Sequence, residues 1–181
     1  MNSIGKRDPE FVITKTPLRI SFAGGGTDLP EFYGEDYGCV VSTTIAQYIY
    51  VTVKRHGHLF NEHYRLNYSE TENVRDVDSI RNAIARECLR LVPVDPPIYI
   101  STVADLPSFS GLGSSSAFAV GLLHALHLMR GERVAGAQLA EEAAHVEIDV
   151  LRRPIGKQDH YASAVGGLNY IRFQCDHRVM I

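Results

Sequence analysis

The segment 106–117, LPSFSGLGSSSA, carries the groups best suited to binding a negatively charged ligand. Its glycines, Gly111 and Gly113, let the backbone approach a ligand closely. Three serines, 114–116, follow at the expected start of a helix, where unpaired N–H groups and the positive end of the helix dipole attract anions. Their hydroxyls can also bond phosphate oxygens or ligate a hard cation such as Mg²⁺. The segment therefore predicts a phosphate-binding loop, with a plain helix start capped by one serine as the alternative.

Other glycine-rich motifs fit this segment poorly. The Walker pattern GxxxxGK[ST] is absent, and Ser116 stands where a dinucleotide fingerprint has its third glycine. Gly113–Ala117 loosely matches the nucleophile elbow of hydrolases, with Ser115 as nucleophile and Asp159 and His177 as partners. The final alanine of that motif and the lack of an HGGG-type oxyanion loop disfavour the hydrolase hypothesis.

Three ordered motifs give the chain a family resemblance that covers nearly its whole length. The pattern PxxxGLGSSxA from Pro107 resembles the second motif of the GHMP kinases, named for galactokinase, homoserine, mevalonate and phosphomevalonate kinases. Thr16–Asp28 (TPLRISFAGGGTD) resembles the first motif of that family, and Gly156–Asp159 (GKQD) is the third match. The resemblance implies ATP as cofactor. The stretch 17–33 is most similar to bacterial members that phosphorylate the anomeric hydroxyl of D-glycero-D-manno-heptose 7-phosphate.

The resemblance implies a catalytic pair, Asp159 and Arg19. Asp159 matches the aspartate that accepts the proton of the attacking hydroxyl; an ordinary helix-capping aspartate is the alternative. Arg19 is expected beside it, lowering its pKa and so holding it ionised. The residues that the resemblance assigns to nucleotide binding lie in the phosphate loop: Pro107, Gly111, Leu112, Gly113, Ser114, Ser115 and Ser116.

A magnesium site is implied by the same resemblance. Glu147 matches the helical carboxylate ligand of the family, acting with a serine of the glycine loop, Ser115 first and Ser114 second. An oxygen site of this kind is chemically sensible because Mg²⁺ screens phosphate charge from carboxylates. The alternative is a solvated acidic helix face, since Glu147 lies among other acids, Glu141, Glu142 and Asp149.

The sugar-phosphate substrate is expected near the first and third motifs, at Gly25, Gly26, Thr27, Asp28 and Lys157. Asp28 matches a family aspartate that binds sugar hydroxyls, with a local Asx-turn as the alternative. Galactokinases carry a Glu-His pair where this chain has Gly25 and Gly26, which leaves room for a bulkier sugar and predicts that galactose is a poor substrate. Lys157, with the neighbouring pair 152–153, could contact a substrate phosphate or simply be solvated.

These groups need an alternating set of strands and helices to position them. The sequence predicts strands at 11–23, with Pro17 requiring an edge or a bulge, and at 39–54, 64–68, 98–103 and 168–173. It predicts helices at 79–92, with Ser79 as cap, and at 114–129, 137–152 and 158–164. Strands that precede and interleave with helices indicate a two-layer α+β fold. The family resemblance implies a domain like the second domain of ribosomal protein S5.

The composition of the chain argues against several classes of protein. The 181 residues include 18 Lys and Arg against 21 Asp and Glu, a net charge of −3, so no nucleic-acid-binding surface is indicated. No apolar stretch is long enough for a membrane helix, and Met1–Glu10 has no apolar signal core. Three widely spaced cysteines suggest reduced thiols. A cytoplasmic protein without membrane partners is expected, and a homodimer is left open.

The length fits about one domain, whereas family members run to about two. Residues 1–181 are therefore expected to form the N-terminal, ATP-binding GHMP domain, without the C-terminal domain. Two alternatives to a heptose phosphate kinase follow. One is a truncated half that binds nucleotide or sugar phosphate without turnover, and the other is a related fucose or galactose 1-kinase.

Overall fold

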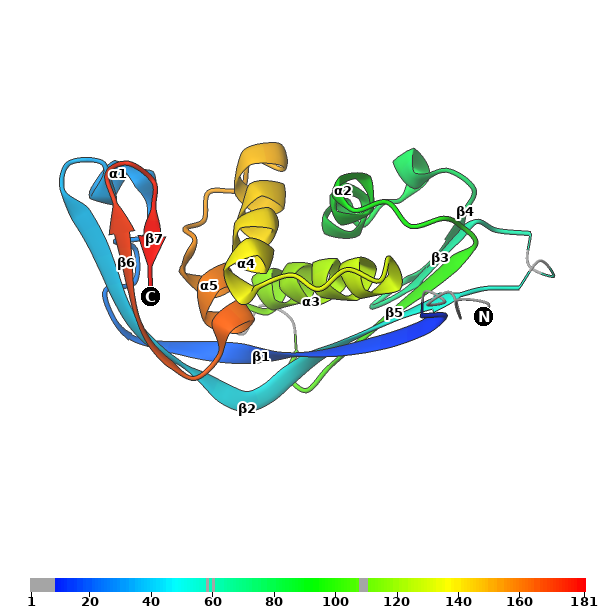
Figure 1. Ribbon diagram of the computed structural model, residues 1–181, viewed down its shortest axis with the longest axis horizontal. Helices are drawn as coiled ribbons and strands as arrows, with labels where there is room; N and C mark the ends of the chain where they lie inside the picture. Colours follow the sequence, from blue (N-terminus) through cyan, green and yellow to red (C-terminus); the bar gives the residue numbers. More distant parts are fainter. Residues whose placement is uncertain (1–8, 58, 60, 108–110) are drawn as a thin grey trace, which may run out of the picture.

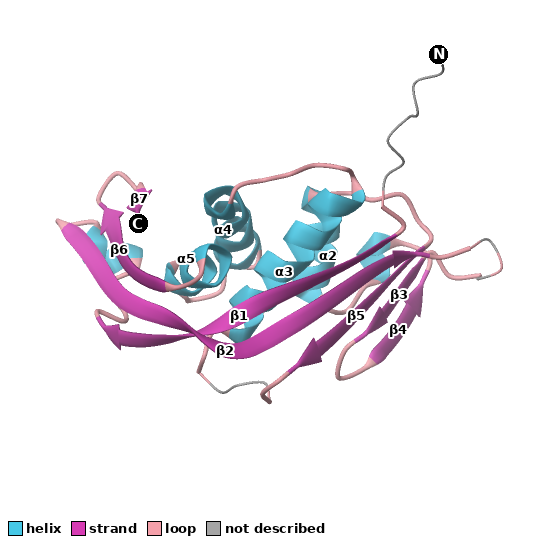
Figure 2. Ribbon diagram, turned by 60° about the horizontal axis from the view of Figure 1, so that its bottom comes forward, coloured by secondary structure: helices cyan, strands magenta, loops and turns pink. Residues whose placement is uncertain are grey.

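A curved seven-stranded sheet forms one layer of the structure, and helices α2–α5 cover one of its faces (Figures 1 and 2). The computed structural model describes residues 9–57, 59, 61–107 and 111–181. The strand order is β4-β3-β5-β2-β6-β7, with β1 on the other side of β2. Only the β3–β5 pair is parallel among these pairings. The strands are β1 (Phe11–Ala23), β2 (Tyr37–Arg55), β3 (Tyr64–Asn67), β4 (Thr71–Val74), β5 (Ile98–Ala104), β6 (Leu168–Gln174) and β7 (Val179–Met180).

The helices form the second layer. They are α1 (Pro30–Tyr33), α2 (Ala83–Leu91), α3 (Ser114–Met129), α4 (Gly136–Ala144) and α5 (Gln158–Val165), with a 3₁₀ turn at Val77–Ser79 and a π-helical turn at His145–Val150. The predicted two-layer mixed fold is therefore confirmed. None of the described helices combines the length and the apolar character that crossing a membrane requires.

Strands β1 and β2 form the long antiparallel pair that supports the rest of the sheet. β1 alternates exposed and buried side chains from Phe11 to Thr16, and within the described residues it pairs with β2 alone, so it is an edge strand. The register shifts between Pro17 and Arg19. This confirms the expectation that Pro17 requires an edge position or a bulge, because proline cannot donate to the ladder. The shift lies directly before Arg19.

Helix α3 is the central helix of the core. It is apolar on almost every face, and Leu122, Leu123 and Leu126 are fully buried. It packs closely on β1: the Thr14 hydroxyl donates to the Gly121 carbonyl oxygen at 2.8 Å. A helix buried this way holds its N-terminus in a fixed place, which is where the phosphate-loop sequence lies.

Two boundaries differ from the sequence-based expectation. Ser79 does not cap α2, because the helix begins at Ala83 and the Asn82 side chain accepts the Ala85 N–H at 3.1 Å. The buried Glu72 carboxylate accepts the N–H groups of Arg81 and Asn82 at 2.7 and 3.0 Å, which holds these residues outside the helix. The predicted single helix 137–152 is also divided, since α4 ends at Ala144 and the π-helical turn follows.

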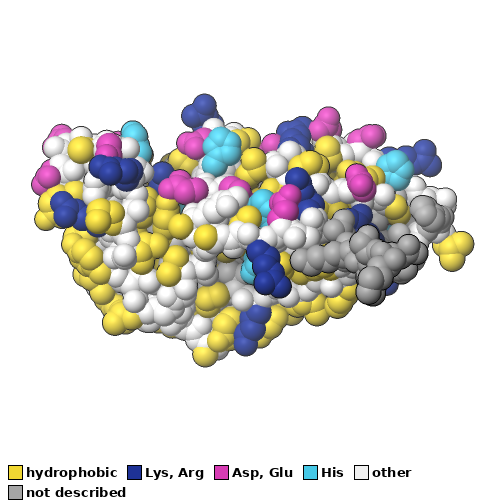
Figure 3. Space-filling model, viewed as in Figure 1, with side chains coloured by type: hydrophobic (Ala, Val, Ile, Leu, Met, Phe, Trp, Pro, Cys, Tyr) yellow, Lys and Arg dark blue, Asp and Glu magenta, His cyan; other side chains and the backbone are white. Residues whose placement is uncertain are grey.

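The two faces of the molecule differ in character (Figure 3). Charged side chains gather over the helical layer, whereas apolar side chains gather over β1, β2 and β6. Four large residues on this part of the sheet are exposed: Ile20, Phe22, Leu168 and Tyr170. The charged side chains seen in this view therefore lie mainly on the helical side of the molecule.

Candidate active site

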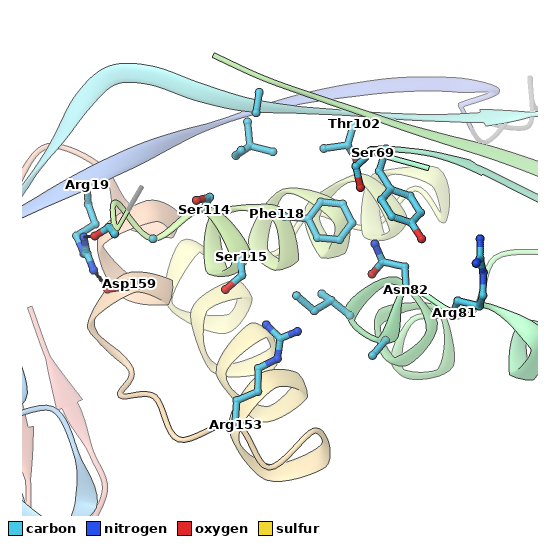
Figure 4. Close-up of a pocket in the computed structure, with 17 residues that line it drawn as sticks. Arg19, Ser69, Arg81, Asn82, Thr102, Ser114, Ser115, Phe118, Arg153 and Asp159 are labelled. Carbon is cyan, nitrogen blue, oxygen red and sulfur yellow. Dashed lines mark hydrogen bonds and ion pairs between the residues drawn. The ribbon is translucent and has the colours of Figure 1, made fainter. Parts of the chain in front are cut away.

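A cavity of about 950 Å³ lies between the sheet and the helical layer (Figure 4). Arg19 and Asp159 lie at one end, the start of α3 forms the middle, and Ser69, Arg81 and Asn82 lie at the other end (Figure 4). The remaining lining residues are Ile49, Tyr68, Ala83, Ile84, Thr102, Ala104, Gly111, Gly113, Ser114, Ser115, Phe118 and Arg153. The structure thus brings residues of the three sequence motifs to one elongated cavity.

Asp159 and Arg19 form a close ion pair although 140 positions separate them in the chain. Asp159 Oδ1 accepts from Arg19 Nε at 2.7 Å and from Nη2 at 2.5 Å. The third arm of the guanidinium, Nη1, donates to the Gly111 carbonyl oxygen at 2.9 Å. Asp159 Oδ2 accepts no hydrogen bond from the described part of the chain, and it faces Gly113, where a Cβ would lie 3.1 Å from it. One carboxylate oxygen is therefore held by Arg19, and the other is free toward the start of α3.

Burial controls the protonation of Asp159. Loss of solvent raises the pKa of this carboxyl, and the adjacent Arg19 guanidinium offsets this only in part, so the net shift is upward. The nearby Asp28 charge adds to the rise. Arg19 lowers the pKa of Asp159 as expected, but desolvation outweighs the cation, so the pKa remains above its ordinary value. A raised pKa makes Asp159 a stronger base once it is ionised.

The start of α3 is built to receive an anion. Gly113 precedes the helix in the left-handed conformation with φ 79°, and no side chain of the described residues caps the first N–H groups. Ser114 and Ser115 line the cavity, whereas Ser116 is buried below it. The Leu112 carbonyl oxygen accepts the Arg19 N–H at 3.2 Å, which ties the loop to β1. Pro107, at the start of the predicted loop, is exposed and does not line the cavity. Residues 108–110 of that loop lie outside the described residues.

Glu147 lies fully buried beneath this helix start, in the π-helical turn rather than in a regular helix. Its Oε1 accepts from Arg153 Nη1 at 2.7 Å, and its Oε2 accepts from His160 Nε2 at 2.9 Å. Burial alone would raise the pKa of Glu147, but hydrogen bonds from His160, Ser116 and Ser115 hold it below the ordinary value. A solvated acidic face is therefore excluded for Glu147.

The donor chemistry at Glu147 fits Mg²⁺. The carboxylate and the neighbouring serine hydroxyls are hard oxygen donors, and Mg²⁺ is usually held by one or two carboxylates plus substrate phosphates. The described residues contain no cluster of three or more His, Cys, Asp or Glu side chains that could hold a metal without such help. Arg153 already supplies a cation to Oε1, so a metal ion would have to share or replace that contact.

Apart from Arg19, the residues of the first motif do not line the cavity. Asp28 is 2% exposed, and its carboxylate accepts from the Gln158 backbone N–H at 2.9 Å and the Gly26 N–H at 3.1 Å. The Thr27 hydroxyl is also engaged, since it donates to the Cys39 carbonyl oxygen and accepts the Cys39 N–H, both at 2.9 Å. In this structure both side chains bind the protein itself, and Asp28 holds the start of α5, which carries Asp159.

The other residues expected to bind the sugar phosphate are Gly25, Gly26 and Lys157. The two glycines are exposed, and a Cβ at Gly26 would meet nothing within 4 Å among the described residues, which is consistent with room for a ligand. Lys157 is not a lining residue of the cavity, and its ammonium lies 3.8 Å from Glu141 Oε2. The structure therefore does not bring Lys157 to the site.

The far end of the cavity was not predicted from sequence. It contains Tyr68, whose hydroxyl donates to Glu72 Oε1 at 2.7 Å, together with Asn82 and Phe118. Asn82 could have been recognised as a helix cap, because asparagine directly precedes an apolar helix pattern there. His160 was also missed, since a lone histidine on a short helix gives no sequence signal for a buried contact with Glu147.

Comparison with known families identifies this arrangement. Residues 77–167 match the family described as the GHMP kinases N-terminal domain. The matched range runs from the loop before α2, through the phosphate loop, to the end of α5, so it includes Asp159 and Glu147. The fold and the site define a GHMP kinase N-terminal domain, and the chain belongs to the GHMP kinase family.

Two heptose phosphate kinases resemble the chain over most of its length. The D-glycero-alpha-D-manno-heptose 7-phosphate kinase of Campylobacter jejuni is 34% identical over 186 residues, covering 93% of this chain and 52% of that protein. The crystal structure of a D-glycero-D-manno-heptose 1-phosphate kinase from Bacteroides thetaiotaomicron matches with a TM-score of 0.83 and 26% identity, covering 93% of this chain and 58% of the other. Galactokinase of Lactococcus lactis, at 17% identity and a TM-score of 0.72, shares the fold. The chain spans about half the length of the relatives it matches.

Proposed function

We propose that residues 1–181 form the ATP-binding, N-terminal domain of a sugar kinase. The reaction transfers the γ-phosphoryl group of ATP to the anomeric hydroxyl of a sugar phosphate, D-glycero-D-manno-heptose 7-phosphate. The observation that carries this proposal is the position of Asp159. Its free Oδ2 faces the uncapped start of α3 within one cavity, so a base lies beside a site for phosphate.

The chain of ATP phosphates is assigned to the start of α3. The backbone N–H groups there and the hydroxyls of Ser114 and Ser115 face the cavity, and the helix dipole favours negative charge. The nucleoside then extends toward Asn82 and Phe118 at the far end, where polar and aromatic side chains line the wall. This orientation points the terminal phosphate toward Asp159.

Asp159 acts as the base in the transfer step. Oδ2 takes the proton of the anomeric hydroxyl as its oxygen bonds to the γ-phosphorus, while the bond from that phosphorus to the ADP oxygen breaks. Arg19 keeps the carboxylate oriented through Oδ1 and also holds Gly111, so the base and the phosphate loop keep a fixed separation. Bound Mg²⁺ would neutralise phosphate charge, with Glu147 and Ser115 as its protein ligands.

The choice of substrate rests on the relatives and on the first motif. Both kinases named above act on a heptose phosphate. Galactokinases carry two large side chains where this chain has Gly25 and Gly26, and a Cβ at Gly26 would meet nothing within 4 Å among the described residues, which favours a larger sugar over galactose. Asp28 is 2% exposed, so it would reach a sugar hydroxyl only if the residues around it moved apart.

A substrate panel tests the proposal. The protein is incubated with Mg²⁺, ATP and one of four acceptors, heptose 7-phosphate, L-fucose, galactose or mevalonate, and ADP release is followed. Release that depends on heptose 7-phosphate, with the new phosphate on the anomeric carbon by ³¹P NMR, is the expected result. Efficient turnover of galactose, fucose or mevalonate instead would contradict the assigned substrate.

A second candidate function follows from the length of the chain. Because the chain spans about half of its relatives, it could bind nucleotide without completing a catalytic cleft. ADP binding in the absence of turnover with every acceptor would favour this binding half over the kinase.

A further inference from the structure

Arg153 stands out among the arginines of the cavity because part of its guanidinium is unengaged close to the start of α3 (Figure 4). Its Nη1 donates to Glu147 Oε1 at 2.7 Å, and neither Nε nor Nη2 donates to another residue in the described ranges. The side chain is 38% exposed and lines the cavity. Figure 4 shows it pointing from the end of the π-helical turn toward Ser115. A cation with free donors therefore faces the start of α3.

Arg19 cannot play the same part. Its Nε and Nη2 are held by Asp159, and its Nη1 is held by the Gly111 carbonyl oxygen. Binding a phosphate through Arg19 would cost the pair that orients the proposed base. Its side chain is also only 11% exposed, which leaves little of it open to a ligand.

Arg81, at the far end of the cavity, lies beside two carboxylates. Its Nη2 lies 2.7 Å from Glu70 Oε2, and its Nε lies 3.6 Å from Glu72 Oε2. With two carboxylates nearby, its charge is compensated, and it lies far along the cavity from Ser115 (Figure 4). Arg153 is thus the lining arginine whose donors are both free and close to the start of α3.

The contact with Glu147 preorganises Arg153. A buried carboxylate needs a compensating charge, and this ion pair fixes the direction of the guanidinium at little entropic cost when a ligand arrives. The Arg153 backbone N–H also donates to the Glu147 carbonyl oxygen at 3.0 Å, so the residue is anchored twice to the same turn. The planar guanidinium can hold a carboxylate with one arm and phosphate oxygens with the others.

We propose that Arg153 binds the phosphate chain of the nucleotide, closing it against the start of α3. The inference rests on the proposed nucleotide cavity and adds a residue that none of the three sequence motifs contains. Two groups then hold the phosphates from opposite sides: the start of α3, with its backbone N–H groups and the hydroxyls of Ser114 and Ser115, and the free arms of Arg153. The ligand class is a nucleoside di- or triphosphate, recognised through its phosphates rather than its base.

The test compares ligands with and without phosphates. ADP, tripolyphosphate and adenosine are titrated into the protein in EDTA, so that no divalent cation bridges the phosphates. Arg153→Met is expected to weaken ADP and tripolyphosphate by about 10- to 100-fold, the range for a charge-assisted hydrogen bond. Adenosine affinity should not change. Arg153→Lys, which keeps the charge without the planar fork, should give a smaller loss.

Two further variants control the experiment. Arg152→Met removes the neighbouring positive charge from an exposed side chain that does not line the cavity, and it should leave ADP affinity unchanged. Arg153→Met combined with Glu147→Gln avoids an uncompensated buried carboxylate, so it keeps the test valid if the single variant folds poorly. The double variant should show the same selective loss of phosphate ligands.

The outcomes separate this inference from the proposed function. Unchanged ADP affinity in both Arg153→Met proteins would overturn the role of Arg153 and leave the nucleotide cavity intact. An equal loss of ADP and adenosine would also overturn it, because that pattern indicates a general structural effect. If the unsubstituted protein bound no ADP, the proposed function itself would fail.

Discussion

Replacing Arg19 with glutamine tests how strongly the catalytic pair depends on its surroundings. Exposed ion pairs contribute about 0.2–1 kcal/mol to stability, whereas removing one partner of a buried pair costs about 3–5 kcal/mol. The exposed fractions of 11% for Arg19 and 22% for Asp159, with two short contacts to one oxygen, place this pair near the buried case. We therefore expect Arg19→Gln to lower the free energy of unfolding at pH 8 by about 3 kcal/mol.

The cost of Arg19→Gln should depend on pH in a defined direction. Burial already raises the pKa of Asp159, and losing the guanidinium raises it further. The penalty is therefore largest above that pKa, where the carboxylate is charged, and shrinks as the pH falls and the carboxyl binds a proton. Urea unfolding at pH 8 and pH 5 measures both values.

The matched control for this experiment is Arg19→Gln combined with Asp159→Asn. Because the neutral amide needs no cation, the double variant should recover part of the stability and lose the pH dependence of the penalty. A loss below about 1 kcal/mol that is the same at both pH values would refute the reasoning, since that is the behaviour of a solvated surface pair.

Two other substitutions probe the middle of the cavity and the buried carboxylate behind its far end. Gly113→Ala should weaken ADP binding, measured by titration calorimetry, because φ 79° disfavours a side chain and the new Cβ would lie 3.1 Å from Asp159 Oδ2; unchanged affinity would contradict the close approach. Glu72→Gln should cost about 1–3 kcal/mol at pH 7. Burial opposes ionisation of Glu72, but hydrogen bonds from Arg81, Tyr68 and Asn82 outweigh it and lower its pKa. That stability is present above the ordinary glutamate pKa and is lost as the pH falls through the lowered value, so thermal melts should show the two proteins converging in acid.

Much of the fold could be predicted because its signals are local. The strand sequences at 11–23 and 39–54 and the apolar run at 114–129 gave boundaries close to those observed for β1, β2 and α3. The start of α2 could not be placed, because Glu72, a residue of a different strand, holds Arg81 and Asn82 out of the helix. The π-helical turn also escaped prediction, since no glycine or proline marks it within His145–Val150.

The site was predictable to the extent that its residues lie in motifs. Asp159, Arg19 and the start of α3 were found through the family resemblance, and the structure brings them together. The net rise in the pKa of Asp159 was not predicted, because the burial that outweighs the effect of Arg19 cannot be read from the sequence. Asp28 is held by Gln158, which lies more than 100 residues away in the chain. Lys157 lies beside Glu141, more than 15 residues away, rather than in the cavity. No local sequence pattern predicts either contact.

The central claim, that Asp159 is the base of a phosphoryl transfer to a sugar phosphate, is tested most directly by Asp159→Asn. The amide keeps the size of the side chain and loses the ability to take the proton. The account predicts that this variant binds ADP as tightly as the unsubstituted protein, while ADP release with Mg²⁺, ATP and heptose 7-phosphate falls by at least about 100-fold. Turnover at the unsubstituted rate in Asp159→Asn would contradict it.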